Sequence, residues 1–341
     1  MSDLTVKEGA AAQAEQPPAP ADTAEEARRG SRLQGRLGPL VIYVGFLLVF
    51  AFFAITLHDR GFLTSDNLFN IVRQSAPVLV MAVGMTYVIS TSEIDLSVGS
   101  TVGLAALGSA MATRDHNAVV GVLVGLAIGL VVGLCNGLIT TKVRIPSFLV
   151  TLGMMSVASG ITQRLTNLVS VPITSDTFNS LFGSGSVAGI PGLLFWALAF
   201  TLVGHFFYRC TRFGRHVLAV GGNREAAASV GINTDRVRVG VFVISGLCAA
   251  TAGLLYAGSL HSAQYMLGTN DLLTAIAATV IGGTSLFGGR GSIVGAAFGA
   301  LLMGVLNNGL VLMGLSVAEQ ITIRGVLIIV AVSLSMRERR A

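Results

Sequence analysis

Two carboxylates, Glu93 and Asp95, lie in a short polar break between two apolar runs of this chain. The first run covers residues 77–89, and the second begins at Val98. A carboxylate next to hydrocarbon is costly, so it must face protein, a water-filled path or the bilayer surface. Irregular backbone at membrane depth is tolerated only where it is buried in protein or lines a cavity. Broken apolar segments of this kind are typical of transport proteins.

The residue types in this break allow three interpretations. The acids could bind a cation or a proton, or they could line a path for a polar solute. In the third interpretation Asp95 and Ser97 cap a helix that begins near Val98, while Glu93 lies at the membrane surface. The residues alone leave these interpretations open.

The segment 209–238 is the longest polar interruption of the apolar pattern. Within it, Asn223 is suited to cap a short helix over 224–230, and Gly231 is suited to end that helix in the left-handed conformation. Glu225 falls in the first turn, where the helix dipole stabilises a carboxylate. A helix this short is marginal in water on its own. We therefore expect it to dock, either on a cytoplasmic partner or on the bundle of its own chain.

Other polar side chains within or near apolar runs could donate hydrogen bonds to a hydroxylated solute, although each could equally join two helices. The candidates for a translocation path are Glu93, Asp95, Ser97, Asn136, Thr284, Ser285, Asn307 and Asn308. Two of them belong to a second break, 281–291, whose glycines permit a tight turn or a re-entrant backbone.

The sequence shows no pattern for catalysis or metal binding. The five histidines never pair at i and i+4, and the three cysteines, Cys135, Cys210 and Cys248, are scattered singly. No GxGxxG or GxxxxGK[ST] segment occurs, so no nucleotide site is expected. We expect no enzyme activity, no metal and no cofactor in this chain. If ATP drives transport, another polypeptide binds it.

Membrane-spanning helices are the elements that must position these residues. Of the 341 residues 52% are hydrophobic and only 11% are charged, whereas a typical soluble domain has about 25% charged residues. Many of the 42 glycines lie within apolar runs, which fits close helix packing through small residues. The sequence predicts an all-α polytopic membrane protein in contact with lipid. Its net charge of +5 indicates basic inner loops rather than nucleic-acid binding.

A transmembrane helix needs about 17–25 apolar residues. Ten segments approach this length, some of them short: 38–57, 76–91, 98–113, 118–140, 147–167, 190–208, 239–260, 271–287, 292–314 and 317–336. With a cytoplasmic N-terminus, sixteen of the 22 Lys and Arg residues fall on the inner side and five on the outer side, with Lys7 left in the tail. We expect ten spans with both termini inside. Eight spans plus re-entrant half-helices at 76–91 and 271–287 are the alternative.

The chain divides into a tail and one membrane domain. Residues 1–35, rich in Ala, Glu, Gln and Pro, are expected to form a disordered cytoplasmic tail, and 36–341 a transmembrane domain that includes the cytoplasmic loop 209–238. Two stretches of the domain resemble distant copies, one with Gly125, Gly129, Gly133, Asn136 and Gly137, the other with Gly295, Gly299, Gly304, Asn308 and Gly309. Opposite directions in the expected topology would suit an inverted repeat, although GxxxG spacing is common in any glycine-rich bundle.

Four ordered motifs resemble the membrane permeases of ribose-type ABC sugar importers. They are 94–100 (IDLSVGS), 136–137 followed by 145–153 (IPSFLVTLG), 214–232 (GRHVLAVGGNREAAASVGI) and 274–291 (TAIAATVIGGTSLFGGRG). The resemblance covers roughly residues 40–335 and implies a fold related to the larger type II importers, such as the cobalamin system. It also implies a second permease copy (as a homodimer or heterodimer), a cytoplasmic ATPase that binds ATP and Mg, and an extracytoplasmic sugar-binding protein.

The resemblance further implies that 214–232 is the region coupled to the ATPase. The residues assigned to this region are Gly214, Arg215, His216, Gly221, Gly222, Asn223, Arg224, Glu225 and Gly231. Where many members of the family have two glycines before IDLSVGS, this chain has Ser92 and Glu93. The extra carboxylate leaves open a sugar-like substrate other than an ordinary aldopentose.

On this basis we expect a permease subunit that imports a monosaccharide or sugar-like solute across the bacterial inner membrane. A loaded binding protein would dock on the outer loops around 167–190 and 261–270, and the ATPase would move 214–232. One rival is an ion-coupled secondary carrier that uses Glu93 or Asp95. Another is an ABC permease for a nucleoside or a branched-chain amino acid, although the IDLSVGS motif favours a sugar. A structural scaffold ranks last, because it would need no broken helices.

Overall fold

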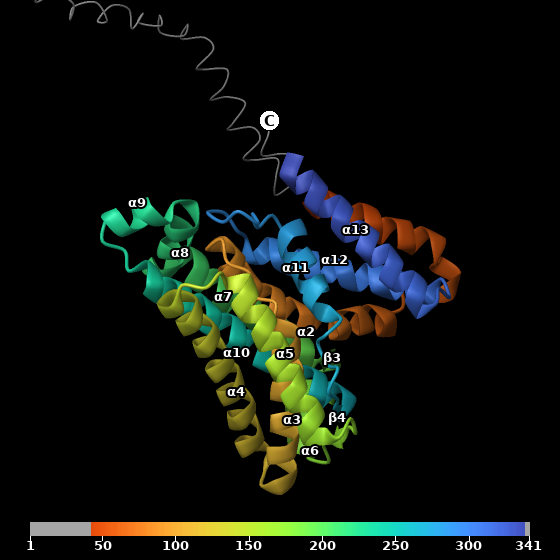
Figure 1. Cartoon of the computed structure of the whole chain (residues 1–341). Coiled ribbons are helices and arrows are strands. Elements are labelled where there is room, and N and C mark those ends of the chain that lie inside the picture. Colours follow the sequence, from red (N-terminus) through yellow and green to blue (C-terminus); the bar gives the residue numbers. More distant parts are fainter. Residues whose placement is uncertain (1–41, 338–341) are drawn as a thin grey trace, which may run out of the picture.

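The computed structural model describes residues 42–337, with the side chains of 327, 328 and 330–337 left out, and the described chain is predominantly helical (Figure 1). The predicted tail 1–35 lies outside the described residues. The helices are Ile42–Thr56, η1 (His58–Arg60), α2 (Ser65–Ser90), α3 (Val98–Asp115), α4 (Ala118–Leu138), η2 (Ile139–Val143), α5 (Ser147–Thr166), α6 (Asp176–Asn179), η3 (Ser180–Ser184), α7 (Gly192–Cys210), α8 (Arg212–Gly222), α9 (Arg224–Ser229), α10 (Thr234–Leu260), α11 (Asp271–Ile281), α12 (Ile293–Leu312) and α13 (Val317–Arg337). Two antiparallel strand pairs join loops, β1 (Val171–Pro172) with β4 (Ser262–Ala263) and β2 (Ser186–Val187) with β3 (Ile190–Pro191).

The prediction of an all-α membrane protein is confirmed. Each of the ten predicted apolar segments overlaps one helix of the structure. Within the described residues, five helices are long and apolar enough to cross a membrane: Ser65–Ser90, Ala118–Val143, Gly192–Cys210, Thr234–Leu260 and Ile293–Leu312. The apolar pattern therefore located the helices well, although it located some of their ends poorly.

The start of α2 is the main correction to the predicted segments. The helix begins at Ser65, where the side chain of Thr64 accepts a hydrogen bond from the Asn67 amide, and it has 26 residues. Asn67 and Arg73 interrupt the apolar pattern and concealed the first turns. A re-entrant half-helix at 76–91 is therefore wrong. At 271–287, by contrast, α11 has 11 residues and a length of about 16 Å, roughly half the thickness of the hydrocarbon core.

The two longest helices, α2 and α10, form the centre of the bundle. In each of them 67% of the most apolar window is buried, and 72% in α12 beside α2, against 28% in the span that contains α4 and 22% in α7. The hairpin of α3 and α4 packs on α10, while the hairpin of α11 and α12 packs on α2. The hairpin that follows α2 thus packs on α10, and the hairpin that follows α10 packs on α2. A pair of internal copies would produce this reciprocal arrangement.

Glycines make the close contacts of both hairpins. A Cβ at Gly129 would collide with the backbone of Gly246 in α10, and one at Gly133 with the backbone of Phe242. In α12, a Cβ at Gly299 would collide with the backbone of Ala278 in α11. The α4 glycines thus pack on the long helix α10, whereas Gly299 packs within its own hairpin, and the repeat stays a hypothesis.

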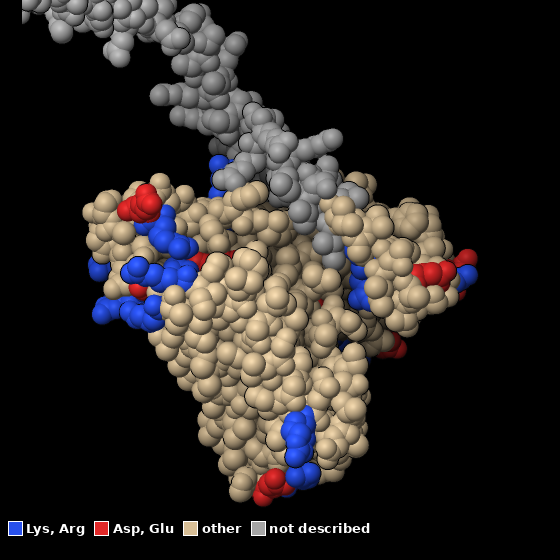
Figure 2. All heavy atoms as spheres, viewed as in Figure 1, with Lys and Arg blue, Asp and Glu red and all other residues tan. Residues whose placement is uncertain are grey.

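Charged side chains form separate groups on the face that Figure 2 shows. Lys and Arg gather at the end that α8 and α9 form, above a flank almost free of charge. Smaller charged groups lie at the opposite tip, near the ends of α3 and α5, and on the side where α13 lies. The uncharged flank between the α8–α9 end and the α3–α5 tip suits a bilayer between two aqueous phases.

Candidate functional site

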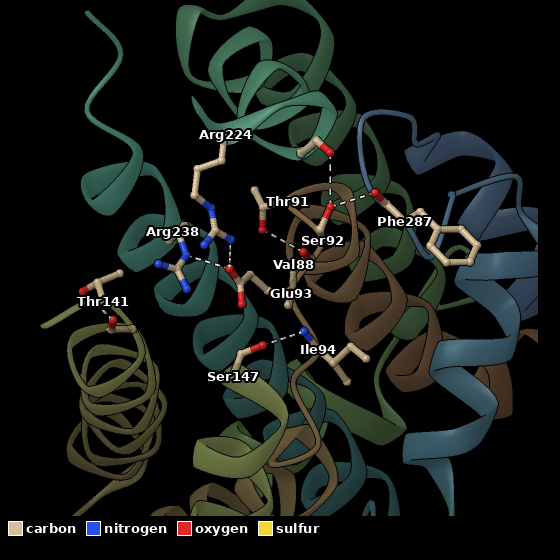
Figure 3. Close-up of polar contacts among 12 residues, drawn as sticks. Val88, Thr91, Ser92, Glu93, Ile94, Thr141, Ser147, Arg224, Arg238 and Phe287 are labelled. Atoms are coloured by element: carbon tan, nitrogen blue, oxygen red, sulfur yellow. Dashed lines mark hydrogen bonds and ion pairs between the residues drawn. The ribbon is translucent and has the colours of Figure 1, made fainter. Parts of the chain in front are cut away.

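The break between α2 and α3 lies directly beside the short helix α9. The Glu93 Oε1 atom accepts hydrogen bonds from Arg224 Nη2 in α9 and from Arg238 Nε in α10, each at 2.6 Å (Figure 3). Glu93 is 4% exposed and Arg238 is 8% exposed, whereas the Arg224 side chain is 45% exposed. One buried carboxylate therefore joins the break to two consecutive helices, α9 and α10, that lie more than 100 positions further along the chain. Glu93 is thus buried among protein groups, and its position relative to the membrane surface stays a prediction.

Ser92 adds a second connection at the same place. Its backbone is left-handed, with φ of 62°, a conformation that is uncommon for a residue other than glycine. The Ser92 hydroxyl lies 3.1 Å from the carbonyl oxygen of Gly221, at the end of α8, and 2.7 Å from that of Phe287. The Gly289 amide also donates to the Ser90 carbonyl. The break, the segment 209–238 and the second break 281–291 therefore meet at one site.

Asp95 lies deeper in the bundle and is held by hydroxyl groups. Its Oδ1 atom accepts from the amide and the hydroxyl of Ser97, at 3.0 and 2.6 Å, and Oδ2 accepts from Ser245 in α10 at 2.8 Å. Asn136 of α4 donates to the Ser97 hydroxyl at 2.8 Å. Helix α3 begins at Val98 as expected, but the Ser97 side chain makes no capping bond to it. These groups join helices, which is the role that the sequence left as an alternative for each.

The start of α5 supplies partners for the backbone of the break. The Ser147 hydroxyl accepts from the Ile94 amide at 3.1 Å, and the Thr151 hydroxyl accepts from the Leu96 amide at 3.0 Å. These hydroxyls satisfy groups that lost their helical partners where α2 ends. Ser147 and Thr151 were not among the predicted site residues, although both lie in the motif 145–153. Their i, i+4 spacing in an apolar helix was the signal that could have found them.

The short helix of 209–238 forms as predicted, ending within one residue of the expected position. Asn223 accepts from the Ala226 amide at 2.9 Å, α9 ends at Ser229, and Gly231 has φ of +85°. Helix α8 precedes it and was not predicted as a separate element. Of the residues assigned to ATPase coupling, Arg215, Gly222, Asn223, Arg224, Glu225 and Gly231 are exposed, His216 is half-buried, and Gly214 and Gly221 are buried. The exposed residues offer a surface to a partner, and the coupling role itself stays a prediction.

The remaining candidates for a translocation path lie in two other places. Thr284 and Ser285 shape the second break: the Thr284 hydroxyl accepts from the Ser292 amide at 3.4 Å, and the Ser285 amide donates to the Arg290 carbonyl. Asn308 exchanges two hydrogen bonds with Asn67 at the start of α2, and the neighbouring Asn307 is half-buried. The structure thus divides the eight candidates among the α2–α3 break, the second break and the other end of α2. Their role in a path stays a prediction.

A cavity of about 490 Å³ lies between α2, α4, α7 and α10. Its walls are almost entirely apolar and include Tyr87, Trp196, Phe200 and Leu254. A sugar needs polar partners for its hydroxyl groups, so this cavity is not suited to recognise one. Among the residues that the structure describes, no group of three or more His, Cys, Asp or Glu side chains could hold a metal ion.

Comparison with known proteins gives consistent matches. The family described as "Branched-chain amino acid transport system / permease component" matches residues 67–332. The ribose import permease protein RbsC of Escherichia coli (strain K12) is 41% identical over 278 residues, which cover 80% of this chain and 86% of the relative. RbsC of Bacillus subtilis (strain 168) is 41% identical over 309 residues, covering 89% and 93%. The L-arabinose ABC transporter permease protein AraH of Azospirillum brasilense is 34% identical over 325 residues, covering 94% and 95%. No solved structure matches the chain significantly.

Proposed function

Because this chain belongs to the permease family of ribose-type ABC importers, we propose that it is the membrane-spanning subunit that moves a monosaccharide or sugar-like solute into the cytoplasm. A separate ATPase binds ATP and Mg and powers the movement. An extracytoplasmic binding protein delivers the sugar, and a second permease copy completes the path. The protein is a multi-pass protein of the bacterial inner membrane, and we place both of its termini in the cytoplasm.

The meeting of three polar segments around Ser92 and Glu93 is the observation that carries this proposal. Helix α9 is exposed at the charged end of the molecule, and Arg224 ties it to the break between α2 and α3. A partner that moves α9 therefore acts on the break directly through Arg224. The break in turn contacts α10 through Asp95 and α5 through Ile94, so a shift there reaches several spans.

The class of solute follows from the named relatives. RbsC is named for ribose import and AraH for L-arabinose, whereas the family description names branched-chain amino acids. We prefer a sugar because individual relatives named for sugars are 34–41% identical to this chain over most of its length. The secondary-carrier alternative loses support, since two arginines hold Glu93 and three hydrogen bonds hold Asp95. Neither carboxylate is free to take a coupling ion in this conformation.

Co-purification tests the proposal. The tagged chain is extracted from its native membrane in mild detergent, and the accompanying proteins are identified by mass spectrometry. We expect an ABC ATPase in comparable amount to the permease. A chain that comes out alone or only self-associated, under conditions that keep a known ABC complex intact, would contradict the assignment.

A further inference from the structure

Ser92 and Glu93 form a latch between the break and the segment that includes α8 and α9. We propose that this latch, which we define as Ser92 and Glu93 with their partners Gly221, Arg224 and Arg238, is a positioning device that makes the break follow α9. The inference rests on the proposed function and specifies how a movement at the ATPase side would enter the membrane domain.

Arg224 is the side chain that attaches α9 to the latch. Helix α9 has six residues, and Ala227 is the one that is buried. So small an apolar contact cannot fix the position of a helix by itself. The bond from Arg224 to Glu93, at 2.6 Å, is a charge-assisted one and ends on a buried acceptor. The ion pair is therefore the main directional link between α9 and the membrane domain.

Arg238 makes the other side of the latch rigid. It is buried, lies in α10 and donates to the same Glu93 oxygen as Arg224 does. A buried carboxylate that loses its partners is destabilising, so Glu93 stays with Arg238 when α9 is displaced. A displacement of α9 must therefore carry Glu93 and α10 along, or it must break the bond to Arg224.

Ser92 fixes the end of α8 against the same turn. Its left-handed backbone is strained for a side chain, and such strain persists only where the surroundings hold it. The hydroxyl bonds to the Gly221 and Phe287 carbonyls hold it here. On the backbone side, Gly221 approaches the Ser90 carbonyl so closely that a Cβ would collide with it. The segment that includes α8 and α9 thus contacts the break at two points, the end of α8 and the start of α9.

The first test measures attachment without any partner. Hydrogen exchange of the full-length chain in nanodiscs is followed by mass spectrometry over 222–232. Glu93→Gln and Arg224→Gln should each speed exchange there several-fold, because the segment opens more often once its ion pair is lost. The double variant should add little beyond Glu93→Gln, because Glu93→Gln already removes the bond to Arg224. Exchange unchanged in Glu93→Gln would overturn the latch.

Two further variants guard against a general loss of folding. Ser92→Gly removes the hydroxyl links and also relieves the left-handed strain, so it should fold while exchange over 222–232 rises. Asp115→Asn makes the same carboxylate-to-amide change in the exposed pair Arg114–Asp115 and should leave exchange over 222–232 unchanged. If Asp115→Asn sped that exchange as much as Glu93→Gln does, the effect would be non-specific and the latch would be rejected.

The second test measures transmission in the complex purified with its ATPase. Proteoliposomes with ATP inside are given binding protein and labelled D-ribose or L-arabinose outside, and sugar uptake is divided by ATP hydrolysed. Glu93→Gln should lower this ratio several-fold while the amount of bound ATPase stays the same, and Glu93→Asp should restore part of it. A merely structural role would lower uptake and hydrolysis together and leave the ratio unchanged.

The two failures are distinguishable. A wild-type chain that binds no ATPase overturns the proposed function and the transmission role with it, while the exchange experiment still decides whether the latch exists. A wild-type complex that transports sugar, with an unchanged ratio in Glu93→Gln, overturns the latch as a transmission device and leaves the proposed function standing.

Discussion

At the scale of single residues, Glu93 shows what the sequence could and could not predict. The break, its acids and the cap at Asn223 were all readable from residue types and spacing, because they depend on local physics. The partners of Glu93 were not, since Arg224 and Arg238 lie 131 and 145 positions away along the chain. Burial adds a structural role to the three interpretations that the sequence left open for these acids. Here Glu93 is neutralised by two arginines that belong to other helices.

The two arginines should differ in their effect on stability. Arg238→Gln removes a buried partner, and losses of about 3–5 kcal/mol are typical when a buried ion pair is broken. Arg224→Gln should cost about 1 kcal/mol or less, because that side chain is half exposed and Arg238 continues to hold Glu93. Thermal unfolding of both variants in the same detergent measures the difference. Equal losses would show that the exposed and the buried arginine contribute alike.

At the scale of elements, the apolar runs correctly located a helix at each of the ten predicted segments. They failed at the start of α2, where Asn67 and Arg73 interrupt the apolar pattern inside the helix. Asn67 pairs with Asn308 of α12, whereas Arg73 is exposed and bonds to Asn70 of the same helix. The apolar runs also missed α8, because the charged residues of this helix are typical of a loop. The glycine rows were visible, but their partners in α10 and α11 depend on the fold.

The contact between α4 and α10 should be intolerant of larger side chains. Gly129→Val places a branched side chain against the backbone of Gly246, and overpacking of this kind costs about 1–3 kcal/mol or forces the helices apart. The matched control is Gly153→Val in α5, where a Cβ would meet no atom within 4 Å. Thermal stability in detergent should fall for the first variant and stay near wild type for the second. Comparable losses in both would indicate a cost of the substitution itself rather than of the contact.

At the scale of the whole molecule, charge sorts the two ends of the bundle. The basic end is the one that carries α8 and α9, and the positive-inside rule places such an end in the cytoplasm. The ATPase must act from the same side. The orientation of the chain, the position of the coupling surface and the identity of the partner therefore depend on one another. A labelling experiment can test the orientation.

Accessibility of single cysteines tests this orientation. In a variant whose three native cysteines are serine, Val230→Cys at the exposed end of α9 should react with a membrane-impermeant maleimide only in inside-out vesicles. Asp115→Cys, at the other tip, should react only in right-side-out vesicles. Labelling of both positions from the same side would contradict the topology.

ATP-dependent sugar uptake by the reconstituted complex is the most direct test of the central claim. The chain is purified with its ATPase, placed in proteoliposomes with binding protein, and supplied with labelled D-ribose or L-arabinose in the presence and absence of ATP. The account predicts uptake that requires ATP and persists when ionophores remove every ion gradient. Uptake without ATP that collapses with the ionophores would contradict it and would identify a secondary carrier.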